Sequence, residues 1–77
     1  MEFQEGEPRW RQIADVLEKR IREGTYAPGA RVPSVVAIQE EFGVASATAQ
    51  KALSGVRNRG LTYTEPGLGS FVRRLDT

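Results

Sequence analysis

The 77-residue sequence contains no cysteine and no histidine. These absences exclude disulfide frameworks, zinc sites of the Cys/His kind, thiol nucleophiles and histidine-based acid–base catalysis. No stretch approaches the roughly 20 apolar residues of a membrane span, and the acidic start lacks the apolar segment of a signal peptide. We therefore expect one cytoplasmic domain that folds by packing alone, is not an enzyme, and uses no cofactor, metal or membrane.

The charges nearly cancel, with eleven Lys and Arg against ten Asp and Glu, but they are unevenly distributed. Residues 1–7 hold three glutamates and no base, whereas residues 44–74 hold five bases and one acid. The second half can therefore present a basic face although the whole chain carries only +1. Taken by itself, this distribution fits a solvated surface with scattered arginines better than a nucleic-acid site.

The first helix is expected to begin near Pro8 and to end at Gly24. Its apolar residues recur at spacings of three and four, which predicts an amphipathic helix with one buried side. This stripe consists of Trp10, Ile13, Ala14, Leu17 and Ile21. Two acid-before-base pairs, Asp15–Lys19 and Glu18–Arg22, are expected to stabilise it.

Two shorter helices follow. Ser34 can cap a helix over residues 35–42, with Phe42 on its buried side, and Gly43 can end it. A third helix is predicted over residues 46–59, with a buried stripe of Ala49, Ala52, Leu53 and Val56. This third segment has bases and no acids. The pair therefore indicates a helix-turn-helix at about residues 35–54, whose second helix can enter a DNA major groove.

The sequence ends in a predicted hairpin. Residues 61–65 and 70–74 are rich in β-forming residues and flank the reversal at Pro66, Gly67, Leu68 and Gly69. The fold class is therefore mainly α with a small β-hairpin: a winged helix-turn-helix of three helices plus a two- or three-stranded antiparallel wing over residues 61–74. Residues 31–32 are the candidate extra strand, and residues 1–7 are expected to form a flexible tail before the domain at residues 8–74.

Five segments closely resemble the N-terminal domain of the GntR family of bacterial transcription regulators. They are QIADVLEKRI, GTYAPGARVPS, FGVASAT, KALSGVRNRGL and PGLGSFV, and the resemblance covers residues 10–72. It implies a winged-helix domain that binds double-stranded DNA, most often in a repressor that a small effector releases. Family members bind inverted-repeat operators as homodimers through a larger C-terminal domain, so residues 75–77 would begin the linker to it. The present chain by itself is expected to be a monomer, or a weak dimer at most.

Three arginines that typically contact DNA in this family are missing. Val36, Ser46 and Gln50 occupy their positions, so the usual operator rule of the family does not carry over. Gln50 can still pair with adenine through N6 and N7. Val36 is open to two interpretations, contact with a thymine methyl or packing on Val32.

The candidate DNA-binding residues share a place on the helix-turn-helix or the wing. They are Ser34, Val36, Ser46, Ala47, Thr48, Gln50, Lys51, Arg57 and Gly67. Hydroxyls near the start of the third helix suit phosphates, helped by the helix dipole. Lys51 can reach phosphate or guanine, and Arg57 is evenly balanced between phosphate contact and a solvated position. The alternative function is a winged helix that serves as a protein–protein interaction module, because the net charge is low and the arginines are missing.

Overall fold

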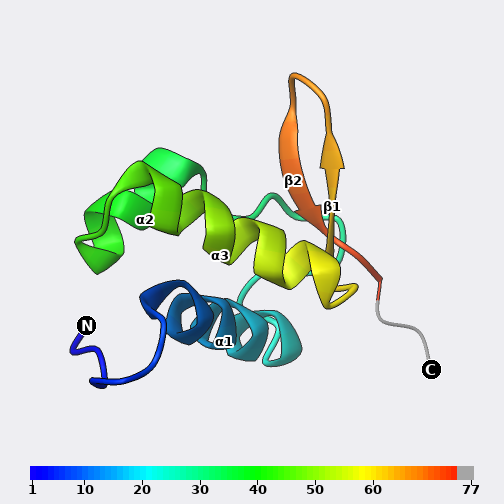
Figure 1. Cartoon of the computed structure of the whole chain (residues 1–77). Helices are drawn as coiled ribbons and strands as arrows, with labels where there is room; N and C mark the ends of the chain where they lie inside the picture. Colours follow the sequence, from blue (N-terminus) through cyan, green and yellow to red (C-terminus); the bar gives the residue numbers. More distant parts are fainter. Residues whose placement is uncertain (75–77) are drawn as a thin grey trace.

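The computed structural model describes residues 1–74 (Figure 1). Its elements are α1 (Arg9–Arg22), α2 (Val35–Phe42), α3 (Ser46–Asn58), β1 (Thr62–Glu65) and β2 (Gly69–Val72). The two strands form a hairpin that projects beyond the three helices (Figure 1). The predicted winged-helix architecture is confirmed, while the predicted linker at residues 75–77 lies outside the described residues.

Local capping groups define α2. The Ser34 hydroxyl accepts a hydrogen bond from the Ala37 backbone N–H at 3.1 Å, which satisfies one of the free donors at the helix start. Gly43 ends the helix in the left-handed conformation, with φ of 67°, where a side chain would be strained. Both ends of α2 therefore lie where the sequence predicts them.

The core lies where the three helices meet the base of the hairpin. The three helices contribute most of the buried apolar side chains, and those from α3 are small, which lets it pack closely. The buried set is Ile13, Ala14, Leu17, Ile21, Val32, Ile38, Phe42, Ala49, Ala52, Val56, Leu61 and Val72. Leu53, predicted as part of the same stripe, is only half-buried beside this core.

The hairpin pairs Thr62 with Val72 at its base and Glu65 with Gly69 near its tip. Burial does not alternate at the base, because Leu61 and Thr62 are both buried where the hairpin enters the core. The candidate third strand is a single bridge between Arg31 and Phe71. The turn before it and Pro33 after it, which has no N–H to donate, limit this pairing to one residue.

Residues 1–7 run beside α1, although the sequence predicts a flexible tail there. The backbone of Gln4 donates to Gln12 Oε1 at 2.9 Å and accepts from Gln12 Nε2 at 3.1 Å. Phe3 packs against the core, with the Arg9 guanidinium 5.2 Å from its ring centre. These contacts give the segment a defined path, whereas its mobility stays a prediction.

Ion pairs connect α1 to the other helices. The predicted Glu18–Arg22 pair is present at 2.8 Å, but Asp15 pairs with Arg59 at 2.8 Å in place of Lys19. The reason is tertiary: the end of α3 packs on α1 and brings Arg59 within reach of Asp15 and Glu18. The hydrogen bond from Arg22, and then that from Arg59, holds the pKa of Glu18 below its ordinary value.

Candidate nucleic-acid interface

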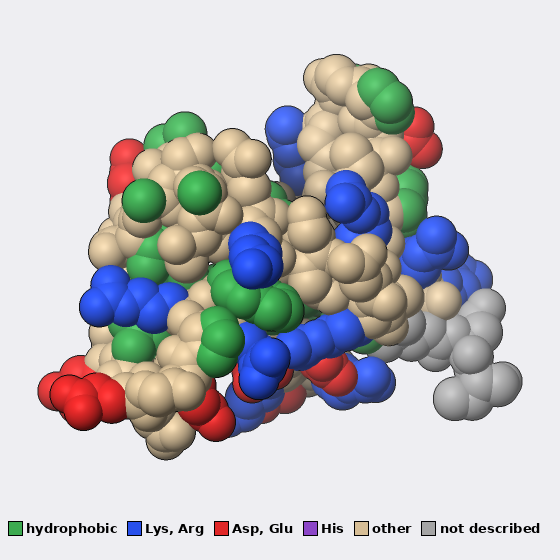
Figure 2. Space-filling view, in the orientation of Figure 1, with side chains coloured by type: hydrophobic (Ala, Val, Ile, Leu, Met, Phe, Trp, Pro, Cys, Tyr) green, Lys and Arg blue, Asp and Glu red, His purple; other side chains and the backbone are tan. Residues whose placement is uncertain are grey.

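The first turns of α3 present a small, uncharged face to solvent. Ser46, Ala47 and Gln50 are exposed, whereas Ala49 and Ala52 point into the core. This division follows from the helical period, which places residues three and four apart on one side. In Figure 2 the surface over α2 and the start of α3 is mostly polar or backbone with scattered hydrophobic atoms, and Lys and Arg side chains lie at its margins.

A hydrogen bond orients the amide on this face. Gln50 Nε2 donates to Ser46 Oγ at 3.0 Å, one helical turn earlier. One N–H of the amide is therefore used within the helix. The carbonyl oxygen, which is an acceptor, and the second N–H, which is a donor, remain for another partner.

Lys51 lies at the edge of α3 that packs on α1. Its ammonium is 5.3 Å from the centre of the Trp10 ring, a cation–π distance. Trp10 itself packs over Gly55, where an added Cβ would lie 3.0 Å from the indole Cζ3. Thr48 precedes Lys51 by three residues and Gly55 by seven, so it shares this edge and is half-buried. Trp10, predicted as part of the buried stripe of the first helix, is half-buried between the two helices.

Arg57 bridges α3 and the wing. Its guanidinium donates to Thr64 Oγ1 and to Ser54 Oγ, both at 3.4 Å, and Thr64 Oγ1 lies 3.2 Å from Ser70 Oγ. The residue is exposed, and within residues 1–74 these two hydrogen bonds occupy two of its five N–H donors. The arrangement places a positive charge above the junction of helix and hairpin.

A groove of about 200 Å³ separates the wing from the start of α2. The Ser34 hydroxyl, the Thr64 side chain and Arg31 line it. Arg31 lies so close to the wing that a Cβ on Gly69 would be 2.7 Å from its Nε. The exposed guanidinium could move away from such a Cβ, but Gly69 has φ of 116°, so the backbone itself requires glycine. Val35 and Leu53 line it as well, so the groove is mostly apolar and has a cation on one wall.

The wing tip exposes a glycine and a leucine, and the first turn of α2 exposes a valine side chain. Gly67, with φ of 80°, and Leu68 form the exposed turn of the hairpin. Val36 is 61% exposed, whereas Val32 is 5% exposed and belongs to the core. This exposure does not fit the interpretation that Val36 packs on Val32. It leaves an apolar side chain open to a partner.

The profile of the bacterial regulatory proteins, gntR family, matches residues 10–72. The chain belongs to the GntR family. Its fold and sequence are those of the DNA-binding domain of a GntR transcriptional regulator, and the resemblance proposed from the five sequence segments is confirmed.

The curated relatives are longer proteins. An uncharacterised HTH-type transcriptional regulator of Rhizobium meliloti is 37% identical over 99% of this chain and 31% of its own length. The HTH-type transcriptional repressor NagR of Bacillus subtilis is 36% identical over 87% of this chain and 28% of its own. This GntR domain thus spans about a third or less of these relatives. Relatives and family are transcriptional regulators.

Solved structures agree with the fold. The DNA-binding domain of AraR, in complex with operator ORR3, is similar with a TM-score of 0.82 and 26% identity, covering 94% of this chain and 87% of that one. A crystal structure of a GntR-family transcriptional regulator gives a TM-score of 0.84 and 32% identity, covering 92% and 28%. Within residues 1–74 of the GntR domain, no helix is both long and apolar enough to cross a membrane.

Two polar residues at the candidate interface, Arg31 and Ser54, are not among those predicted from the sequence. Arg31 reaches the wing groove only because its segment bridges to Phe71 across the hairpin. Ser54 lies one turn after Gln50 on α3 and contacts Arg57. The helical period could have identified Ser54, because it follows Ala47 by seven residues, whereas nothing local identifies Arg31.

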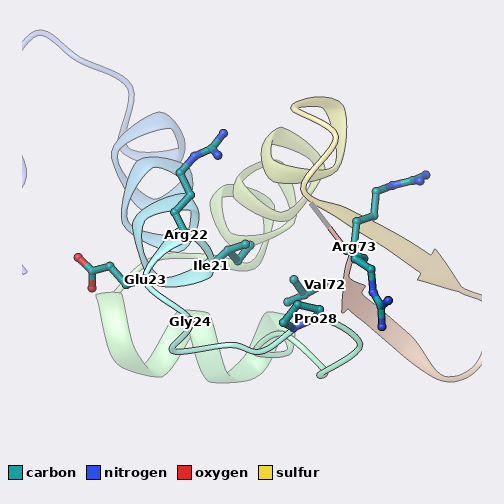
Figure 3. A pocket seen from close by; sticks show the side chains of 8 residues that line it. Ile21, Arg22, Glu23, Gly24, Pro28, Val72 and Arg73 are labelled. Carbon is teal, nitrogen blue, oxygen red and sulfur yellow. The ribbon is translucent and has the colours of Figure 1, made fainter. Parts of the chain in front are cut away.

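The GntR domain has a second hollow, which shares no residue with the candidate interface. It measures about 850 Å³ and lies between the end of α1, the following loop and the end of β2. Figure 3 shows Pro28 and Val72 facing one another within it, while Arg22, Glu23 and Arg73 point outward. The hollow is thus apolar at its floor and charged at its rim.

Proposed function

We propose that this chain binds double-stranded DNA in a sequence-specific manner, with α3 in the major groove and the wing beside it. The observation that carries the proposal is the exposed, acid-free face of α3, which begins with Ser46, Ala47 and Gln50 and is flanked by Lys51 and Arg57. A recognition helix of a helix-turn-helix reads bases with its N-terminal residues. The operator complex of the similar AraR domain supports the same assignment.

The candidate residues divide into two roles. Val36, Ser46, Ala47 and Gln50 face the bases, because they lie on the exposed starts of the two helices. The remaining candidates hold the sugar–phosphate backbone: Ser34, Thr48, Lys51, Arg57 and the backbone of Gly67. Contacts of the second kind set register and affinity, whereas contacts of the first kind set sequence preference.

The longer regulator would be a repressor that acts as a homodimer on an inverted-repeat operator and is released by a small effector bound outside this domain. The names of NagR and of the mannosyl-D-glycerate repressor MngR of Escherichia coli, which is 35% identical over 86% of this chain, support the repressor role. A twofold dimer presents two copies of α3 to two half-sites about one helical turn apart. The 77-residue chain by itself would bind one half-site as a monomer.

Selection from a pool of random duplexes tests the proposal. The expected result is enrichment of a shared half-site, with binding to it at least tenfold tighter than to a scrambled duplex in fluorescence anisotropy. Retention of no duplex at low salt would overturn the proposal and favour the protein–protein interaction module. Equal binding to all duplexes would overturn sequence specificity while leaving DNA affinity in place.

A further inference from the structure

The part of the interface that faces the bases carries no positive charge. Residues 32–50, which include all of α2 and the first turn of α3, contain neither Lys nor Arg. Guanine presents two acceptors, N7 and O6, in the major groove, and its commonest partner is a bidentate Arg or a Lys. This face therefore lacks the group that most often reads guanine.

What the face offers in place of charge is methyl groups. Val36 is 61% exposed in the first turn of α2, and Ala37 beside it and Ala47 on α3 are exposed as well. The C5-methyl of thymine is the apolar group in the major groove, and contact with it removes apolar surface from water on both sides. The same valine against guanine O6 would remove a polar atom from water without giving it a partner.

The hydrogen bond between Gln50 and Ser46 acts in the same direction. Because one N–H of the amide donates to Ser46 Oγ, Gln50 has one free N–H and one free carbonyl oxygen. Adenine presents one acceptor, N7, and one donor, the N6 amino group, which match these two groups. Guanine presents two acceptors, so the carbonyl oxygen of Gln50 would face O6 without a donor between them.

Positive charge is confined to the margins of the face. Lys51 lies on Trp10 toward α1, Arg57 lies at the junction with the wing, and Arg31 lies in the wing groove. We infer that the ligand of this domain is a duplex whose half-site has A·T pairs beneath α2 and the start of α3, with a thymine methyl on Val36 and an adenine on Gln50. This inference rests on the proposed DNA-binding function.

Base analogues test it atom by atom on the selected duplex. Replacing each thymine in turn by deoxyuridine removes the methyl and leaves the base pairing unchanged. We expect one position at which this weakens binding about fourfold, the equivalent of about 0.8 kcal/mol for one buried methyl. Val36→Ala should bind the thymine and uracil duplexes at that position equally, and 5-methylcytosine opposite guanine there should bind more tightly than cytosine.

The adenine contact has its own analogue. Replacing one adenine by 7-deazaadenine removes the N7 acceptor and should weaken the wild-type domain, but not Gln50→Ala, at one position. Ser46→Ala frees the second N–H of Gln50, so it should raise the relative affinity for guanine at that same position. Both Val36 and Ser46 are exposed, and circular dichroism of each variant verifies that it folds.

The outcomes separate the inference from the proposed function. A selected half-site with G·C pairs at the contacted positions, or one in which no uracil substitution changes binding, overturns the inference and leaves sequence-specific DNA binding intact. Sensitivity to uracil that persists unchanged in Val36→Ala overturns the assignment of the methyl to Val36. Failure to select any duplex overturns both.

Discussion

Replacing Lys51 by alanine should weaken binding to every duplex alike and make that binding less dependent on salt. The ammonium lies at the α1 edge of α3, 5.3 Å from the Trp10 ring centre, outside the line of Ser46 and Gln50. A flexible point charge at that edge suits a phosphate better than a base. One phosphate contact contributes about 0.9 to the slope of log K against log salt. Between 50 and 200 mM salt, the wild-type domain should therefore lose about 3.5-fold more affinity than Lys51→Ala.

The chain contains a matched control, because its only other lysine is Lys19 on α1. Its side chain is 76% exposed and lies 3.8 Å from Glu23, with no part in the candidate interface. Lys19→Ala removes the same charge from the molecule and should leave the salt slope of the wild type. Fluorescence anisotropy of both variants on selected and scrambled duplexes from 50 to 200 mM salt makes the comparison.

Two results would refute this reasoning. If both lysine variants lower the slope equally, net charge and not a phosphate contact accounts for the effect. If Lys51→Ala weakens binding only to the selected duplex, Lys51 reads a base. Lys51→Ala should also lose the cation–π contact, which should lower the free energy of unfolding by about 0.5–1 kcal/mol. Thermal unfolding can be followed by the fluorescence of Trp10, the single tryptophan.

Three further predictions address the fold and the reading helix. Phe42→Ala should cost about 3–5 kcal/mol of unfolding free energy, because Phe42 is buried in the core; an unchanged melting curve would contradict this. Gln50→Ala should lose about 1–3 kcal/mol on the selected duplex and little on random DNA; equal losses on both would show that Gln50 does not read a base. The hydrogen bond from Arg20 holds the pKa of Glu41 below its ordinary value. The stability that this pair contributes is therefore present above the ordinary Glu pKa of about 4.3, and it is lost as pH falls through the lower pKa of the folded state. Melting curves from pH 6 to 3 should therefore show a shallower loss of stability below pH 4 for Glu41→Gln than for wild type, and parallel losses would refute the pairing.

The elements that the sequence predicts well are those defined by neighbouring residues. Ser34 and Gly43 determine the ends of α2 through a hydroxyl cap and a left-handed turn, and both effects act within four residues. The buried side of α3 follows from helical spacing except at Leu53, which is only half-buried. The residues between those buried positions face solvent, and they include most of the candidate interface on α3.

The features that the sequence does not predict depend on how the helices cross. Asp15 pairs with Arg59 rather than Lys19 because the end of α3 lies on α1, and periodicity within α1 carries no information about that approach. Lys51 meets Trp10 because Gly55 leaves room for the indole between the two helices. Arg31 reaches Gly69 through a one-residue bridge to the hairpin. Each contact joins residues more than 35 positions apart, so each requires the tertiary fold.

The same crossing separates affinity from specificity in the proposed interface. Lys51 lies at the edge of α3 that packs on α1, where it contacts Trp10. Arg57 lies at the opposite edge, where it donates to Thr64 of the wing. The face between them carries uncharged groups, among them Ser46, Ala47 and Gln50, which act at short range and are not screened by salt as exposed charges are. Charges at the edges attract any duplex, whereas the neutral face distinguishes one base pair from another. Substitutions at the edge should consequently change the affinity for all duplexes in parallel, and substitutions on the face should change the ratio between them.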